Sequence, residues 1–167
     1  MIFLPQSIPE ILLIKPSIHV DKRGYFAETY RQDLLEQAAG NEIKFIQDNE
    51  SKSSRGVLRG IHYQLPPFAQ TKLVRVISGS VLDVVVDIRR SSNTFGDYLS
   101  FELSEENKHQ LYIPKGFAHG FVVLSKFAIF SYKVDSFYSP QNERGIAFND
   151  KYLDIDWRLP TKILELS

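Results

Sequence analysis

The sequence contains no cysteine, so disulfide bonds, thiolate metal ligands and a cysteine nucleophile are all excluded. It also carries no excess charge of either sign, because 20 basic side chains balance 20 acidic ones. Nucleic-acid-binding domains generally show a basic excess, so we expect any anion to be bound by a local cluster of cations instead. No apolar stretch is long enough to span a bilayer.

A secretory signal peptide is not expected either. Residues 1–10 contain Pro5 and Pro9 and lack a basic segment followed by an apolar run. We therefore expect a cytoplasmic protein that binds neither membrane nor nucleic acid. A chain of 167 residues is long enough to bury a real core, and we expect one domain over residues 1–167.

The aromatic residues that are present favour β structure, because 12 Phe and 8 Tyr make up most of them. Short apolar or alternating stretches separated by turn residues predict many strands, the clearest at residues 71–77, 81–88, 117–124 and 127–134. Ser78, Gly79 and Ser80 between the first two predict a hairpin. Such a pattern is typical of a sandwich, a jelly roll or a barrel.

Two shorter segments complete the expected fold. Residues 31–39 carry an apolar stripe and are followed by Gly40 and Asn41, which predicts one helix and its end. Residues 51–55 are polar, and we interpret them as a loop.

The stretch from Val57 to Gln64 contains the first candidate site residues. Arg59 is a permanent cation suited to phosphate, and His62 exchanges protons near neutral pH. In a regular strand these two side chains would point to opposite faces. Gly60 between them is typical of a bulge, so we expect a bulge that turns both toward the interior.

Two further residues extend this site to enolate chemistry. Lys72 shares a strand face with Val74, and a cation on an apolar face is costly unless it serves a function. Tyr132 shares a face with Phe130 and is expected to point inward. His62 as base, Lys72 as stabilising cation and Tyr132 as acid would form an enolisation site. Taken singly, each is more readily interpreted as a packed or solvated side chain, and only the combination favours a site.

A metal site is less well supported. Residues 114–119, which end at His119, resemble the second metal motif of cupins. The first cupin motif requires a His-x-His pair, whereas His62 is followed by Tyr63 and Gln64. We therefore predict a cupin-like barrel without a metal. His119 then either contacts the substrate or packs in the core.

A longer set of motifs runs in order over nearly the whole chain. It comprises Arg23-Gly24 with Glu28, then residues 47–49, 56–64, 72–75, 86–89, 114–121 and 132–133, and finally Tyr138-Ser139-Pro140 with Glu143. This set resembles the dTDP-4-dehydrorhamnose 3,5-epimerase family. The resemblance implies a mainly β, cupin-type jelly roll with one or two short helices. It also implies a homodimer that exchanges edge strands, and no metal or organic cofactor.

The resemblance further implies epimerisation of dTDP-4-dehydro-6-deoxy-D-glucose at C3 and C5, for dTDP-L-rhamnose synthesis. His62 matches the catalytic base, Tyr132 the proton donor and Lys72 the cation near the C4 oxygen. Tyr138 matches the residue that stacks on thymine. The other substrate contacts match Arg23, Glu28, Gln47, Asn49, Arg59, His119 and Glu143.

The carboxylate partner of His62 is left open. Family members usually continue past the segment equivalent to residues 163–167. An aspartate shortly beyond that segment pairs with the catalytic histidine. This sequence ends at Ser167, and Asp83 on an expected strand is one candidate for the role.

Other functions remain alternatives at this stage. A relative that epimerises only C3 or only C5 would carry the same motifs. A 3,4-ketoisomerase on the same barrel ranks low, because it would not carry the pattern at residues 58–64. A non-catalytic sugar-nucleotide-binding cupin and a metal cupin are the remaining alternatives.

Overall fold

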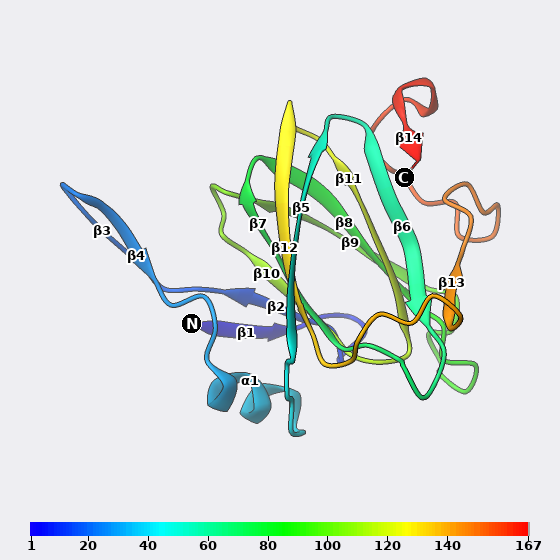
Figure 1. Cartoon of the computed structure of the whole chain (residues 1–167), viewed down its shortest axis with the longest axis horizontal. Coiled ribbons are helices and arrows are strands. Elements are labelled where there is room, and N and C mark those ends of the chain that lie inside the picture. Colours follow the sequence, from blue (N-terminus) through cyan, green and yellow to red (C-terminus); the bar gives the residue numbers. More distant parts are fainter. Residues whose placement is uncertain (167) are drawn as a thin grey trace.

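The computed structural model describes residues 1–166, which form two six-stranded sheets that face each other (Figure 1). The first sheet has the order β1 (Ile2–Pro5), β2 (Leu12–Lys15), β10 (Gln110–Ile113), β7 (Lys72–Ser78), β12 (Phe127–Val134) and β5 (Gln47–Ser54). The second has the order β13 (Glu143–Gly145), β6 (Val57–Gln64), β11 (Phe117–Val123), β8 (Ser80–Asp87) and β9 (Tyr98–Ser104). Its sixth strand, β14 (Glu165–Leu166), pairs in parallel with β6.

The remaining elements are few. A separate hairpin consists of β3 (Ile18–Asp21) and β4 (Gly24–Ala27), and the helices are α1 (Gln32–Ala39) and the short 3-10 helix η1 (Thr161–Ile163). Helix α1 ends where Gly40 takes a left-handed conformation with φ of 72°. The mainly β jelly roll with one or two short helices is therefore confirmed.

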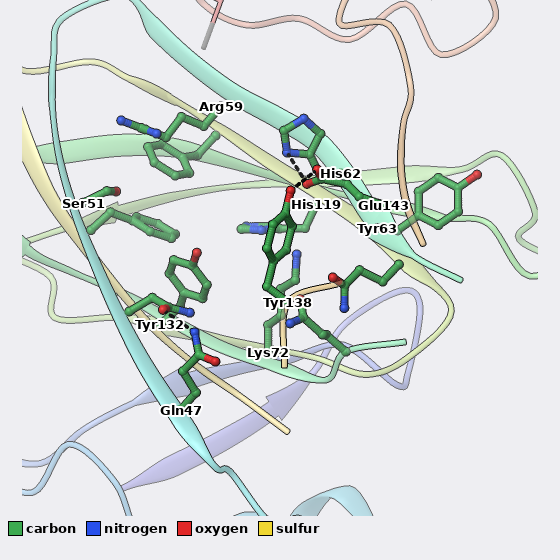
Figure 2. A pocket seen from close by; sticks show the side chains of 15 residues that line it. Gln47, Ser51, Arg59, His62, Tyr63, Lys72, His119, Tyr132, Tyr138 and Glu143 are labelled. Carbon is green, nitrogen blue, oxygen red and sulfur yellow. Dashed lines mark hydrogen bonds and ion pairs between the residues drawn. The ribbon is translucent and has the colours of Figure 1, made fainter. Parts of the chain in front are cut away.

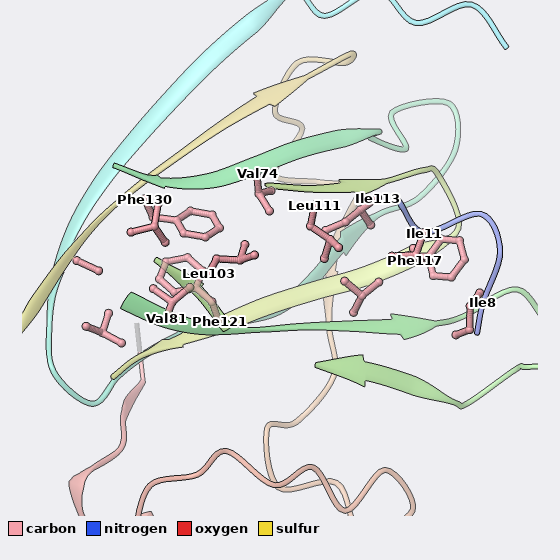
Figure 3. Close-up of a cluster of buried hydrophobic side chains, with 14 residues drawn as sticks. Ile8, Ile11, Val74, Val81, Leu103, Leu111, Ile113, Phe117, Phe121 and Phe130 are labelled. Carbon is pink, nitrogen blue, oxygen red and sulfur yellow. The ribbon is translucent and has the colours of Figure 1, made fainter. Parts of the chain in front are cut away.

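The space between the sheets holds the main core, which Figure 3 shows. Phe121 of β11 and Phe130 of β12 stack across it with ring centroids 4.1 Å apart. Val74, Val81 and Leu111 are fully buried beside them. Burial of each such side chain contributes about 1.5–3 kcal/mol, so this cluster holds the two sheets together.

The outer faces of both sheets are also covered. Leu35 of α1 packs with Leu12 and Tyr112 against the first sheet. The segment around Trp157 packs against the second sheet through Leu82 and its neighbours on the outward face of β8. Leu82 and Asp83 lie on opposite faces of β8, because Leu82 packs in this outer cluster and Asp83 contacts His119.

The interpretation of residues 51–55 as a loop was wrong. Residues Ser51–Ser54 belong to β5, which pairs with the whole length of β12. The main-chain ladder to β12 outweighs the low strand propensity of the polar side chains. Those side chains are tolerated because β5 is an edge strand with one face toward solvent.

The expected bulge at Gly60 is confirmed by the register between β6 and β11. His62 pairs with His119 and Arg59 with Phe121, so β6 carries one residue more than β11 over this interval. Gly60 has φ of 106°, and a Cβ there would lie 2.6 Å from the main chain of β11. Only glycine fits this position, and the bulge brings Arg59 and His62 to the same side.

Candidate active site

One cavity of about 440 Å³ opens between the sheets and collects polar side chains from both (Figure 2). Its size suits a small organic ligand. The lining residues are Gln47, Asn49, Ser51, Arg59, His62, Tyr63, Gln64, Gln70, Lys72, His119, Phe121, Phe130, Tyr132, Tyr138 and Glu143.

Strand β5 contributes three of these side chains through its alternation. Gln47, Asn49 and Ser51 point inward, while the residues between them are exposed. The Gln47 amide donates to Asn49 Oδ1 at 2.7 Å, which orders a polar wall on this side of the cavity.

Strand β6 contributes the cation and the imidazole. Arg59 Nε donates to Ser53 Oγ at 3.0 Å, which orients the guanidinium and leaves its terminal nitrogens toward the cavity. His62 is half-buried, and its Nδ1 lies 3.7 Å from Glu143 Oε1. Burial, helped by the nearby Lys72, lowers the pKa of His62 below its usual 6.5, although Glu143 opposes the shift. The imidazole is thus neutral at pH 7 and able to accept a proton.

Lys72 enters the cavity from the first residue of β7. No carboxylate within residues 1–166 lies within 4.0 Å of its Nζ. Burial lowers the pKa of Lys72 to about 8, and the charges of Asp83 and Glu143 oppose that fall. Lys72 is therefore a cation near neutral pH without a close partner, as expected for a group that stabilises negative charge on a ligand.

Tyr132 faces His62 from the opposite sheet (Figure 2). It packs beside Phe130, which confirms the inward orientation expected from the alternation of β12. Burial raises the pKa of Tyr132, while Arg59 opposes the rise. The phenol therefore keeps its proton at neutral pH and can donate it.

His119 lies at the back of the cavity and is nearly buried. Its Nε2 is 2.9 Å from Asp83 Oδ2. The interpretation of Asp83 as a partner of His62 was wrong, because β11 lies between β8 and β6. Asp83 on β8 reaches the neighbouring strand and meets His119, whereas His62 is one strand further away.

Tyr138 and Glu143 stand at the mouth of the cavity. The Tyr138 hydroxyl donates to Glu143 Oε2 at 2.7 Å, and the Tyr138 ring is exposed. The loop that carries Tyr138 is held by Gln64, whose side chain accepts from the Ser139 amide and donates to the Phe137 carbonyl. An exposed ring on an anchored loop offers a flat surface for a base.

This arrangement agrees with the comparisons to known proteins. The family model described as dTDP-4-dehydrorhamnose 3,5-epimerase matches residues 5–167. The chain belongs to the dTDP-4-dehydrorhamnose 3,5-epimerase family.

Individual relatives agree over almost the full chain. The Shigella flexneri dTDP-4-dehydrorhamnose 3,5-epimerase is 52% identical over 158 residues, which cover 95% of this chain and 87% of the relative. The crystal structure of the Elizabethkingia anophelis enzyme is 48% identical with a TM-score of 0.96, covering 100% of this chain and 91% of that one. A Legionella pneumophila 3,5-epimerase solved in complex with dTDP-4-keto-L-rhamnose is 47% identical, has a TM-score of 0.94 and covers 99% and 87%.

Two residues that match the family's substrate contacts lie outside the cavity. Arg23 is at the turn of the β3–β4 hairpin, where it pairs with Asp21 and is 84% exposed. Glu28 follows the hairpin and lies 3.5 Å from Arg31. The hairpin projects from the body of the molecule (Figure 1), and none of its residues lines the cavity. All the other residues expected at the site line the cavity.

Several lining residues were not among the expected site residues. These are Ser51, Tyr63, Gln64, Gln70, Phe121 and Phe130. The alternation of Gln47 and Asn49, continued along β5, would have found Ser51. Phe121 and Phe130 are core residues whose rings also form the cavity wall, a double role that the sequence pattern does not separate.

No group of three or more His, Asp or Glu side chains that could hold a metal ion occurs within residues 1–166. In the same described part of the chain, none of the helices has the length and apolar character needed to cross a membrane.

Proposed function

We propose that the protein converts dTDP-4-dehydro-6-deoxy-D-glucose into dTDP-4-dehydro-L-rhamnose by epimerisation at C3 and C5, for dTDP-L-rhamnose synthesis. The protons on C3 and C5 are both α to the C4 ketone and are acidic enough for a histidine base once the enolate is stabilised. The ligand named for the Legionella structure, dTDP-4-keto-L-rhamnose, supports this choice of substrate.

The positions of His62 and Tyr132 are the main support for this proposal. They come from different sheets and face each other across one cavity. Epimerisation removes a proton from one face of the sugar and returns one to the opposite face. In the proposal His62 is the base, and Tyr132 is the acid on the far side.

Lys72 stabilises the intermediate in this proposal. Removal of the proton places negative charge on the C4 oxygen, and a cation already in position lowers the barrier to that charge. No carboxylate of residues 1–166 lies within 4.0 Å of the Lys72 ammonium, which leaves it available for the oxygen.

The nucleotide is bound by the remaining side chains. Arg59, oriented by Ser53, binds the diphosphate, and Tyr138 stacks on the thymine. The other proposed substrate contacts in the cavity are Gln47, Asn49, His119 and Glu143.

Arg23 and Glu28 enter the proposal through a second copy of the chain. The β3–β4 hairpin exposes Val20, Tyr25 and Phe26, an apolar surface typical of an interface. In a homodimer with exchanged hairpins, Arg23 and Glu28 of one copy would reach the cavity of the other. This explains why residues that match substrate contacts lie away from the cavity of their own chain. The cytoplasmic location stays a prediction from the sequence.

The proposal is tested by turnover of the purified protein with dTDP-4-dehydro-6-deoxy-D-glucose, followed by proton NMR of the sugar. Inversion at both C3 and C5 is expected. Inversion at one carbon would identify a mono-epimerase, and intact binding without turnover would identify a non-catalytic sugar-nucleotide-binding protein.

The reaction is also expected without a metal or an organic cofactor. Activity should persist in a chelator, and elemental analysis should find no stoichiometric metal. Loss of activity in the chelator, restored by one added metal ion, would contradict this part of the proposal.

A further inference from the structure

Asp83 of β8 is a buried carboxylate to which none of the roles above is assigned. Its exposed fraction is 0%, and its Oδ2 lies 2.9 Å from His119 Nε2. Its other oxygen, Oδ1, is buried and has no hydrogen-bond partner among residues 1–166. A buried polar atom without a partner destabilises a fold, so this arrangement requires an explanation.

Asp87 lies further along β8, on the same face of the strand as Asp83. It shows that a carboxylate buried on this strand can have both oxygens hydrogen-bonded. Asp87 is also 0% exposed. Its Oδ1 accepts from the amide and Nε of Arg89, and its Oδ2 accepts from Arg89, Ser92 and Thr94. Asp87 therefore secures the chain after β8, whereas Asp83 contacts His119 of the cavity lining and has one oxygen without a partner among residues 1–166.

The negative charge of Asp83 affects two neighbouring groups, His119 and Lys72. The hydrogen bond to His119 Nε2 requires a proton on that nitrogen, because an ionised carboxylate only accepts. Among the charges that oppose the fall in the pKa of Lys72, Asp83 is the strongest and Glu143 is second. A negative charge in a buried site acts over a longer distance than in water.

The charged environment of Lys72 comes from several strands. The other charged or titratable groups that line the same cavity are Arg59, His62 and Tyr63 on β6, His119 on β11, Tyr132 on β12, Tyr138, and Glu143 on β13. Arg90 and Lys115 line an adjoining cavity that Lys72 also borders, and Lys115 is paired with Asp135 at 3.1 Å. Burial disfavours the charge of Lys72, and the negative charges of Asp83 and Glu143 favour retention of the ammonium.

We propose that Asp83 is a positioning residue that fixes the His119 proton on Nε2 and keeps Lys72 protonated in the closed cavity. This rests on the proposed epimerase function, because Lys72 must be a cation to stabilise an enolate. Asp83 does not touch the sugar and acts through its two neighbours.

The first test compares the pH profile of kcat in Asp83→Asn, Asp87→Asn and the wild type. Activity requires the Lys72 ammonium, so it falls as the pH rises through the Lys72 pKa near 8. Loss of the Asp83 charge lowers that pKa, and the alkaline limb should move down by about one pH unit. Asp83→Glu, which retains the carboxylate, should leave the limb close to its wild-type position.

Asp87→Asn is the matched control. It removes an equally buried carboxylate from the same strand, so it should lower the melting temperature and leave the alkaline limb in place. A folded Asp83→Asn variant with an unshifted limb would overturn the proposal, as would an equal shift in Asp87→Asn.

A second test needs no turnover and uses the wild-type protein. Nitrogen-15 NMR of the imidazoles should show His119 with its proton on Nε2, assigned by comparison with His119→Asn. A proton on Nδ1 alone would overturn the proposal even if Asp83→Asn failed to fold. Failure of the epimerase function would appear differently, as a wild-type protein with the expected His119 tautomer and no epimerisation.

Discussion

The cavity between the sheets and the β3–β4 hairpin differ in whether one chain supplies all the residues that their proposed roles need. The cavity brings together His62, Lys72 and Tyr132 from three strands and holds them in packed surroundings. The hairpin carries Arg23 on an exposed turn, where its partner is Asp21 two residues away. The proton transfer proposed for the cavity uses residues of one chain, whereas the substrate contacts proposed for the hairpin require a second copy.

In this proposal, residues of the cavity carry out the chemical step, and residues of the hairpin contribute to substrate binding. Loss of His62, Lys72 or Tyr132 should lower the rate of the chemical step, and loss of Arg23 should weaken substrate binding.

His62→Ala should lower kcat by about 10³-fold, because His62 is the proposed base opposite Tyr132. Binding of dTDP should remain, measured by calorimetry, because Arg59 and Tyr138 are unchanged. His109→Ala, which removes a histidine outside the cavity, is the matched control. Near-normal turnover in His62→Ala would disprove its role as base.

Tyr132→Phe should lower the rate of net epimerisation by about 10²-fold and affect proton abstraction less. The phenylalanine keeps the packing against Phe130 and removes only the donor. The measurement compares product formation with loss of the C3 and C5 protons. Tyr98→Phe on β9 serves as the control, and an unchanged rate in Tyr132→Phe would show that another group is the acid.

Arg23→Ala should raise KM by about tenfold and leave kcat nearly unchanged, because Arg23 is proposed to bind the substrate of the partner's site. The neighbouring turn variant Lys22→Ala should change neither constant.

Mixed dimers distinguish exchange from action within one chain. If hairpins are exchanged, refolding Arg23→Ala with His62→Ala should place an intact Arg23 and an intact His62 together in about a quarter of the sites. Those sites should show wild-type KM. No recovery of such sites would contradict the exchange.

The pH dependence of kcat in the wild-type protein should be a smaller effect than those of the substitutions. His62 must be neutral to act as base, and its lowered pKa puts the acid limb of kcat below pH 6.5. Lys72 must be charged, which puts the alkaline limb near pH 8. Tyr132 adds no limb between them, because burial raises its pKa. An acid limb above pH 7 would contradict a neutral His62.

The sequence was sufficient to predict the strands, the bulge at Gly60 and most of the cavity lining. Periodic patterns report which face of a strand is buried, and glycine between Arg59 and His62 indicated the extra residue. The β5 segment from Ser51 was missed because its main-chain pairing with β12, rather than its side chains, makes it a strand. The partner of Asp83 was missed because strand order across a sheet is not encoded in spacing along the chain.

Deuterium incorporation is the most direct test of double epimerisation by His62 and Tyr132. The wild-type protein is incubated in D₂O with dTDP-4-dehydro-6-deoxy-D-glucose, and the sugar is analysed by mass spectrometry and proton NMR. Deuterium should enter at both C3 and C5, because one base and one opposed acid act on the two carbons beside the same ketone. Label at one carbon only, or no label while dTDP still binds, would contradict double epimerisation by the His62–Tyr132 pair.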